Sequence, residues 1–128
     1  FLLEGPGLPP AYVEVKNVHL RRTGDLAEFP DSVTARGARH LAELARMRAA
    51  GARAVLLYVI QRTDCARIGF AADLDPAYVA AAEAARAAGV ESLALRTYIT
   101  RSGVEAGPPA PVVFPRDAAP VAPAREMR

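Results

Sequence analysis

The feature that most constrains the fold is the uninterrupted apolar segment AVLLYVI, residues 54–60. A strand that is apolar at every position is typical of the middle of a sheet that is covered on both faces. Segments with helical patterns flank it, at residues 30–51 and 74–89, and two more strand-like segments lie at 11–20 and 90–100. The order strand, helix, strand, helix, strand favours right-handed crossovers. We therefore predict an α/β fold with a mixed β-sheet flanked by helices.

Residues at the helix ends support this order. Asp31 or Ser32 is placed to cap the first helix, and Gly51 is placed to end it. The second helix has Asp75 at the position expected for its N-cap and Pro76 in its first turn. Both helices therefore carry a start signal in the sequence itself.

The first twenty residues predict a hairpin. FLLE is followed by the turn-forming cluster GPGLPP and then by AYVEVKNVHL, whose side chains alternate between two faces. We expect Val13 and Val15 to lie in the core, and HLRRTGDLAEF, at 19–29, to form a polar loop. Because the strand at Phe1 has no lead-in, we expect the chain to be the C-terminal piece of a longer protein.

The far end of the chain has a different composition. Residues 108–123 hold six of the eleven prolines, mixed with alanine and valine. Proline removes the N–H donors that a β-ladder needs, and such sequences bury little apolar surface. We expect one domain over residues 1–102 and a disordered Pro/Ala-rich tail over residues 103–128.

Composition excludes several classes of protein. The longest apolar run has seven residues, whereas a membrane-spanning helix needs roughly 20. No basic region leads into an apolar stretch, so no signal peptide is expected. Cys65 is the only cysteine, which suits a reducing compartment and predicts a cytoplasmic protein. The net charge of +2 and pI of about 9.0 permit a polyanionic partner without requiring one.

Lys16 is the only lysine among sixteen basic side chains. Glu14 and Lys16 stand two residues apart on a strand, so they point to the same side, about 7 Å apart along the chain. The Glu14 carboxylate and the Val15 carbonyl could bind Mg²⁺, and the ammonium could orient water or stabilise charge on phosphorus. The alternative is an exposed charge pair, because Glu-x-Lys is common on strands.

Four separated segments, in order, resemble one known family. They are FLLE…PPAYVEVKNVHL, FPDSVTARGARHLAEL, RAVLLYVIQRTD and GVESLALRTYIT. Together they are similar to the C-terminal domain of the sugar fermentation stimulation protein A (SfsA) family, from residue 1 to about residue 100. The resemblance implies a restriction-endonuclease-like core of the PD-(D/E)xK type, which here would be N-terminally truncated. It also implies an OB-like domain upstream, DNA binding, and a candidate role in regulating sugar (maltose) metabolism.

The resemblance assigns roles to few residues. Glu14 and Lys16 match the (D/E)xK half of the nuclease motif. The partner aspartate of the motif would stand just before Phe1, and a further acid would lie on an upstream helix, so the Mg²⁺ site would be incomplete. The literal Pro-Asp at Pro30 and Asp31 is not the motif, because it follows Glu14 instead of preceding it.

Gln61 and Arg62 end the central strand, where α/β sheets usually form their ligand crevice. Some nucleases of this fold use a glutamine beyond the lysine strand to position DNA or water, so Gln61 is a candidate catalytic residue. The alternative is a solvated strand end. Asp64, which follows closely, is interpreted as a turn residue.

Arginines form the candidate DNA-binding surface, because phosphate contacts dominate non-specific affinity for DNA. The alternative is a solvated helix face, especially since Glu43 interrupts the stripe on the first helix. The candidate phosphate contacts are Arg21, Arg22, Arg36, Arg39 and Arg62. His40 is interpreted as a packed or surface residue.

Two functional hypotheses remain. The first is a non-specific DNA-binding protein with a nuclease-like domain. The alternative is a Mg²⁺-dependent endonuclease with Glu14 as metal ligand and Lys16 as catalytic lysine. A nucleotide-binding module is a poor fit, because HLRRTGD contains neither G-x-G-x-x-G nor a Walker loop. The sequence leaves the oligomeric state open and predicts no membrane partner.

Overall fold

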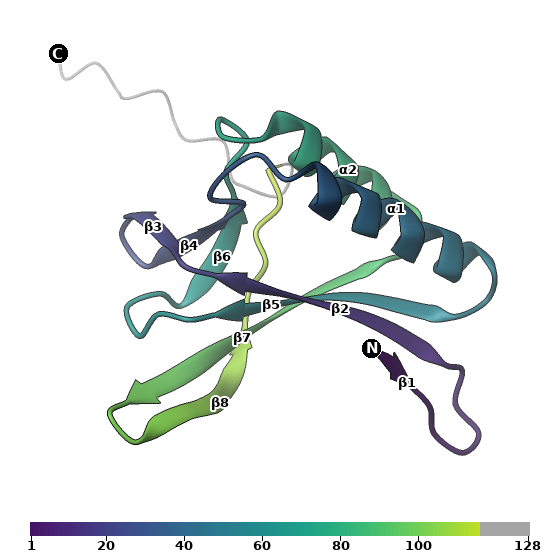
Figure 1. Cartoon of the computed structure of the whole chain (residues 1–128), viewed down its shortest axis with the longest axis horizontal. Coiled ribbons are helices and arrows are strands. Elements are labelled where there is room, and N and C mark those ends of the chain that lie inside the picture. The colour runs from purple at the N-terminus through teal and green to yellow at the C-terminus, as the bar shows by residue number, and fades with distance from the viewer. Residues whose placement is uncertain (116–128) are drawn as a thin grey trace, which may run out of the picture.

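The computed structural model describes residues 1–115 as a mixed α/β domain with two sheets (Figure 1). The five-stranded sheet has the order β1-β2-β5-β7-β8, with β1 at Leu2–Leu3, β2 at Ala11–Val18, β5 at Arg53–Ile60, β7 at Glu91–Thr100 and β8 at Gly103–Ala110. The three-stranded sheet has the order β3-β4-β6, with β3 at Leu20–Thr23, β4 at Leu26–Phe29 and β6 at Arg67–Phe70. Helices α1 (Ala35–Ala49) and α2 (Pro76–Ala87) lie on the same side of the larger sheet.

The strand directions confirm the predicted mixed sheet. β5 is parallel to both β2 and β7, whereas the edge strands β1 and β8 run antiparallel to their neighbours. The parallel pairs require crossover connections, which the segments containing α1 and α2 provide. Within residues 1–115, no helix is long and apolar enough to cross a membrane.

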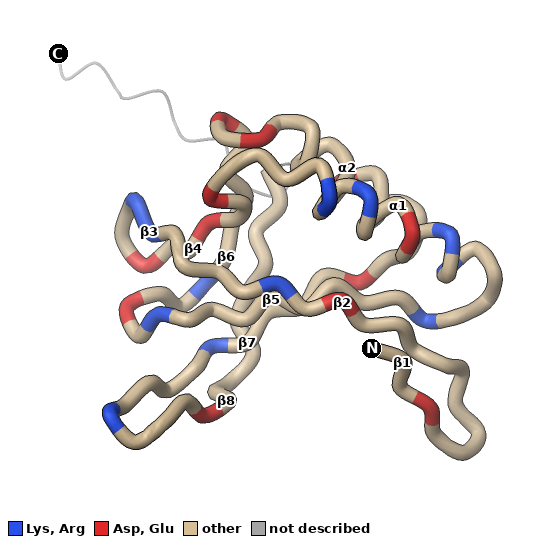
Figure 2. The backbone as a smooth tube through the Cα atoms, viewed as in Figure 1, with Lys and Arg blue, Asp and Glu red and all other residues tan. Residues whose placement is uncertain are grey.

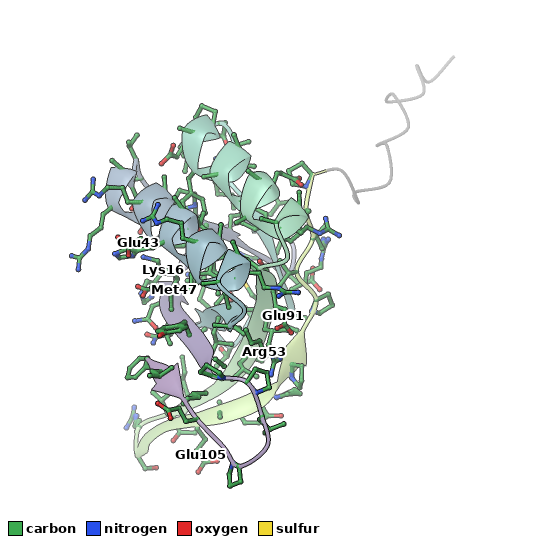
Figure 3. The ribbon with its side chains drawn as sticks, turned by 90° about the vertical axis from the view of Figure 1, so that its right-hand side faces the viewer. Lys16, Glu43, Met47, Arg53, Glu91 and Glu105 are labelled. Carbon is green, nitrogen blue, oxygen red and sulfur yellow. The ribbon has the colours of Figure 1, made fainter. Side chains whose placement is uncertain are left out.

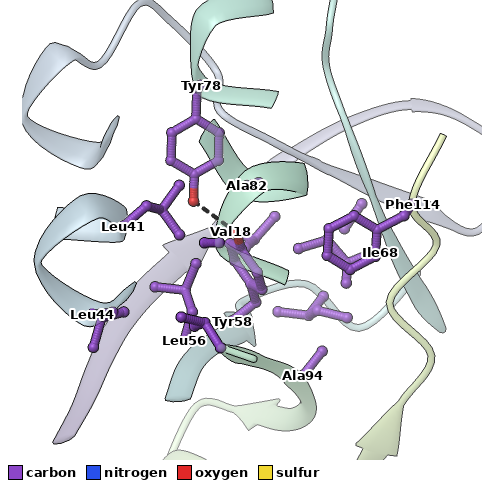
Figure 4. Close-up of a cluster of buried hydrophobic side chains, with 14 of the residues drawn as sticks. Val18, Leu41, Leu44, Leu56, Tyr58, Ile68, Tyr78, Ala82, Ala94 and Phe114 are labelled. Carbon is purple, nitrogen blue, oxygen red and sulfur yellow. Dashed lines mark hydrogen bonds between the residues drawn. The ribbon is translucent and has the colours of Figure 1, made fainter. Parts of the chain in front are cut away.

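The core lies between the helices and the sheet face that they cover. Leu56 and Tyr58 of β5 point into it, and Leu41 of α1 and Tyr78 of α2 meet them from the other side (Figure 4). The hydroxyl groups of Tyr58 and Tyr78 lie 2.7 Å apart, so each buried hydroxyl has a hydrogen-bond partner. This contact fixes α2 over the central strand.

The opposite face of the sheet carries no helix among residues 1–115 (Figure 1). Val13 and Val15 point to this face and are only partly buried, so the prediction that they lie in the core is wrong. Leu57 and Val59 of β5 are half-buried for the same reason. Both faces of β5 are apolar, as predicted, but the helices cover one of them.

The first helix begins later than predicted. Its N-cap is Thr34, whose hydroxyl accepts a hydrogen bond from the N–H of Gly37 at 3.0 Å, so Asp31 and Ser32 do not cap it. Gly51 follows the helix with a positive φ, as predicted for a terminating glycine. The second helix begins as predicted, because the Asp75 carboxylate accepts from the N–H of Tyr78.

Residues 19–29, predicted as a loop, contain the hairpin β3–β4. β4 also pairs in parallel with β6, and this brings Ala27 opposite Ile68 in the core. Each of these strands has only four residues. Their stability depends on pairing with a distant segment, which periodicity in one short stretch does not reveal.

The prediction of a disordered tail from residue 103 is wrong for its first part, because residues Gly103–Ala110 form β8. Within residues 1–115, β8 is an edge strand whose only neighbour is β7, so its prolines can face away from the ladder. Beyond it, Val112 forms a bridge with Ile68, and Phe114 is buried in the core. The rest of the predicted tail, residues 116–128, lies outside the described residues.

Candidate functional site

Lys16 lies on β2, on the sheet face that α1 covers (Figure 3). Glu14 lies beside it on the same strand. The Lys16 ammonium nitrogen is 3.7 Å from Oε1 of Glu14. The side chain of Lys16 is 15% exposed and that of Glu14 is 35% exposed, so the pair is reachable from solvent but not freely solvated. The period of two along a strand places them on one face, as the sequence predicts.

His40 of α1 is the third member of this site. Its Nδ1 lies 3.0 Å from the Lys16 nitrogen and 3.2 Å from Oε1 of Glu14. The sequence alone indicates a packed or surface role for His40 and does not reveal this contact. One signal was present: His40 directly precedes Leu41 and follows Gly37 by three residues, so it borders the buried stripe of the helix.

A small cavity opens beside the site between β1, β2 and α1. Its volume is about 120 Å³, and its lining includes Glu14, His40, Glu43 and Met47. Such a volume holds a few waters or a hydrated ion, but not a nucleotide. A polymeric ligand would therefore contact the site from outside and insert only a small group.

The described chain supplies part of a cation site. Val13 exchanges backbone hydrogen bonds with Phe1, and alternate residues of a strand point the same way, so the Val15 carbonyl also faces the β1 side. The residues of β1 that pair with β2 lie opposite Ala11 and Tyr12, so β1 does not extend as far as Val15. The Glu14 carboxylate and the Val15 carbonyl are oxygen ligands, which Mg²⁺ and Ca²⁺ prefer. Within residues 1–115, no cluster of three or more His, Cys, Asp and Glu side chains is placed to hold a metal.

Gln61 does not join the site. Its side-chain amide donates a hydrogen bond to Oδ1 of Asn17 at 3.0 Å. Asn17 is the neighbour of Lys16 along β2, so its side chain points to the opposite face of the sheet. Gln61 therefore lies across the sheet from Lys16, in contrast to the catalytic role predicted for it.

Three of the arginines predicted to contact phosphate, Arg21, Arg22 and Arg62, form ion pairs with acids of the protein itself. Arg22 forms ion pairs with both Glu28 and Asp73. The guanidinium of Arg62 donates to both carboxylate oxygens of Asp64. These bonds hold the pKa of Asp64 well below its usual range.

Arg21 donates to the carbonyl of Gly24 and lies 3.6 Å from Asp64. Arg21 and Arg62 therefore share the carboxylate of Asp64, whereas Arg22 is paired with two other acids.

Arg36 and Arg39 differ from these three. Both are exposed on α1, and neither forms an ion pair with an acid among residues 1–115. Figure 2 shows basic positions along α1 with a single acidic position between them. Arg36 lies four residues before His40, so the two share one side of the helix.

The fold and the site together define a mixed α/β domain with a Glu-x-Lys pair on the second strand of its sheet. The family model described as "Sugar fermentation stimulation protein RE domain" matches residues 1–103. The chain belongs to this SfsA family, as the sequence predicts.

Close relatives and one solved structure agree with this assignment. The chain is 64% identical to the sugar fermentation stimulation protein homolog of Dinoroseobacter shibae over 112 residues, which cover 88% of this chain and 46% of that protein. It is 66% identical to the homolog of Ruegeria pomeroyi over 105 residues, or 82% of this chain and 46% of that protein. The chain thus spans about half the length of the curated relatives it matches.

The solved structure is described as Pyrococcus furiosus SfsA in complex with Ca²⁺. Its TM-score with this chain is 0.76 at 28% sequence identity, with 81% of this chain and 45% of that chain covered. The likeness at this level confirms the α/β fold and its mixed sheet.

Proposed function

We propose that this chain is a cytoplasmic DNA-binding domain of an SfsA-family protein that contacts the phosphodiester backbone without reading bases. The observation that carries the proposal is the pairing of Lys16 with Glu14 at the junction of β2 and α1, 3.7 Å apart and partly exposed. A role in regulating sugar (maltose) metabolism is a further proposal, which rests on the name of the family.

The charges around the site support a phosphate ligand. Lys16 supplies an ammonium at the sheet, and Arg36 and Arg39 supply guanidinium groups that are not paired with acids in the described chain. Arginine and lysine contacts to phosphate release counterions from DNA, which makes binding favourable at low salt and independent of base sequence. Arg21, Arg22 and Arg62 contribute less, because acids of the protein already compensate their charge.

A divalent cation would assist this contact. Glu14 and the carbonyl of Val15 would hold Mg²⁺ or Ca²⁺ through oxygen, and the ion would attract a phosphate group beside Lys16. The description of the Pyrococcus furiosus protein as a Ca²⁺ complex supports a divalent cation in the family. The set of ligands within residues 1–115 is incomplete, so further ligands would be water or residues of a longer chain.

A mobility-shift titration with duplex DNA tests the proposal. We expect retention at low salt, a steep fall in affinity as salt rises, and weaker binding by Lys16→Ala. Arg53→Ala is the matched control, because Arg53 pairs with Glu91 away from the site. Failure to retain duplex DNA at the lowest salt concentration would overturn the proposal.

A second candidate function, Mg²⁺-dependent endonuclease activity, is favoured by the register of β1. Leu2 stands opposite Tyr12, and Phe1 opposite Val13. In a chain that continues this strand upstream, the residue before Phe1 would stand opposite Glu14 on the same face, with the Cβ atoms about 5 Å apart. An aspartate there would complete a pair of carboxylates for a metal ion.

Incubation of a chain extended upstream by such an aspartate with plasmid DNA and Mg²⁺ or Mn²⁺ tests this second candidate. We expect cleavage that Lys16→Ala abolishes. Equal amounts of product from both proteins would exclude Lys16 as the catalytic lysine.

A further inference from the structure

Three charged or polar groups of the site surround one another closely. Nδ1 of His40 lies 3.0 Å from the nitrogen of Lys16 and 3.2 Å from Oε1 of Glu14. The remaining side of the triangle, from Lys16 to Glu14, is 3.7 Å. A single ring nitrogen thus faces both a group that only donates hydrogen bonds and a group that only accepts them.

These two contacts of Nδ1 exclude each other. An ammonium can only donate, so a hydrogen bond from Lys16 requires a lone pair on Nδ1 and the ring proton on Nε2. A hydrogen bond to Glu14 requires the proton on Nδ1 instead. The position of the ring proton therefore decides whether Lys16 has a hydrogen bond to His40. Without that bond, Lys16 has only an ion pair with Glu14, because the 3.7 Å between its nitrogen and Oε1 of Glu14 exceeds hydrogen-bond distance.

We propose that His40 is the residue that positions Lys16, by accepting its hydrogen bond at Nδ1 while the ring proton stays on Nε2. Among residues 1–115, His40 is the hydrogen-bond partner of the ammonium. The Lys16 side chain is 15% exposed, so loss of this partner would leave a mostly enclosed ammonium without a hydrogen bond from the protein. The inference deepens the proposed function, since it concerns the same lysine.

Helix α1 suits this positioning role. His40 is adjacent to Leu41, and Leu41 and Leu44 are buried against the sheet, so the backbone at His40 is held in place by the core. The lysine head is thereby tied to the helix and not only to its own strand. The Cα atom of Arg36, one turn earlier on the same side of α1, is thereby held at a fixed distance from that of His40.

Two substitutions of similar polarity separate positioning from a general structural role. The side-chain oxygen of Asn can occupy the place of Nδ1, whereas the amide of Gln reaches toward the place of Nε2. We therefore expect His40→Asn to retain the position of Lys16 and His40→Gln to lose it. A residue needed only to fill space or maintain the helix would show no such preference for the shorter amide.

The composition of the chain makes the measurement direct. Lys16 is the only lysine, so lysine labelled with ¹³C at Cε gives one resonance to follow, and there are only two histidines, His19 and His40. In the unsubstituted chain at pH 8 we expect ring ¹⁵N spectra of His40 with the proton on Nε2. We expect restricted motion at the Cε of Lys16 that persists in His40→Asn and is lost in His40→Gln.

The inference would be overturned if the ring proton of His40 in the unsubstituted chain were mainly on Nδ1. It would also be overturned if the Cε of Lys16 were as mobile in the unsubstituted chain as in a folded His40→Gln variant. If the variants do not fold, the ring spectrum of the unsubstituted chain decides. In the DNA titration, His40→Gln is expected to lose as much affinity as Lys16→Ala, and His40→Asn little. If no form binds DNA, the proposed function fails, while the lysine and histidine spectra still decide the positioning role.

Discussion

The carboxylate of Asp75 joins the starts of both helices, because each of its oxygens accepts a hydrogen bond from a different backbone N–H group. Oδ2 accepts from Thr34 at 2.8 Å, and Oδ1 accepts from Tyr78 at 3.0 Å. Thr34 is the N-cap of α1, and Tyr78 lies in the first turn of α2. Because α1 carries His40, this buried acid also helps to set the helix over the site.

Replacing Asp75 with Asn should lower the melting temperature by several degrees, the effect expected from losing a helix cap in a domain of this size. Asn keeps one acceptor oxygen, which can still cap α2, but loses the acceptor for Thr34. Asp31→Asn is the matched control, because Asp31 is exposed and its one hydrogen bond within the described residues is from the hydroxyl of Ser32. Thermal unfolding followed by circular dichroism is the measurement, and equal melting temperatures for both variants would contradict the expectation.

The effect of Asp75 should depend on pH in one direction. The N–H groups of Thr34 and Tyr78 lower the pKa of Asp75 below its ordinary value of 3.8. Because the pKa is lower in the folded chain than in the unfolded chain, the stabilisation is complete above the unfolded value and is lost as pH falls through the folded one. The difference in melting temperature between the unsubstituted chain and Asp75→Asn should therefore shrink below about pH 4. If the difference in melting temperature stays constant down to pH 3, the ionised carboxylate of Asp75 is not the source of the stabilisation.

The buried hydroxyl pair of Tyr58 and Tyr78 should behave as a unit. Either single substitution by Phe leaves the other hydroxyl buried without a partner, and both residues are fully buried. We expect each single variant to lose about 1–3 kcal/mol of unfolding free energy. The double variant should lose less than the sum of the two. Urea unfolding of the four proteins measures this coupling, and strictly additive losses would mean that the hydrogen bond contributes nothing.

The larger elements of the fold could be predicted because each carries its own signal. β5 is apolar over its whole length, α2 starts with Asp75 and Pro76, and β2 alternates with a period of two. β4 and β6 lack such signals, since the burial of Ala27 and Ile68 depends on a pairing between segments about forty residues apart. Non-local pairing of short strands is not encoded in either stretch alone.

The same distinction explains the site. Glu14 and Lys16 could be placed together from the geometry of one strand. His40 could not, because it reaches Lys16 only when α1 packs against β2, 24 positions away. The ion pair between Arg22 and Asp73 joins residues 51 positions apart, so it could not be predicted from the sequence either. Charge counting along the sequence therefore overestimated the number of arginines that are free for a ligand.

Gly37 should resist replacement by alanine even though it lies inside a helix. A Cβ atom at this position would lie 2.9 Å from Oγ1 of Thr34 and 3.1 Å from Cε2 of Tyr78. The clash would disturb the cap of α1, so we expect Gly37→Ala to lower the melting temperature despite a helix-propensity gain of about 1 kcal/mol. Ala42→Gly, at an exposed position of the same helix, measures that propensity in this chain. A higher melting temperature for Gly37→Ala would show that the close contacts are easily relieved.

The arginines of α1 and of β3 should differ in their effect on DNA binding. Arg39 is exposed and is paired with no acid in the described part of the chain, whereas Arg22 already donates to Glu28 and Asp73. If Arg39 contacts a phosphate, Arg39→Ala should weaken binding and reduce the slope of log affinity against log salt by about 1. Arg22→Ala removes a charge that is compensated within the protein, so its slope should remain that of the unsubstituted chain. Both slopes come from one set of mobility-shift titrations, and a larger change for Arg22→Ala would move the DNA-binding surface from α1 to the β3–β4 hairpin.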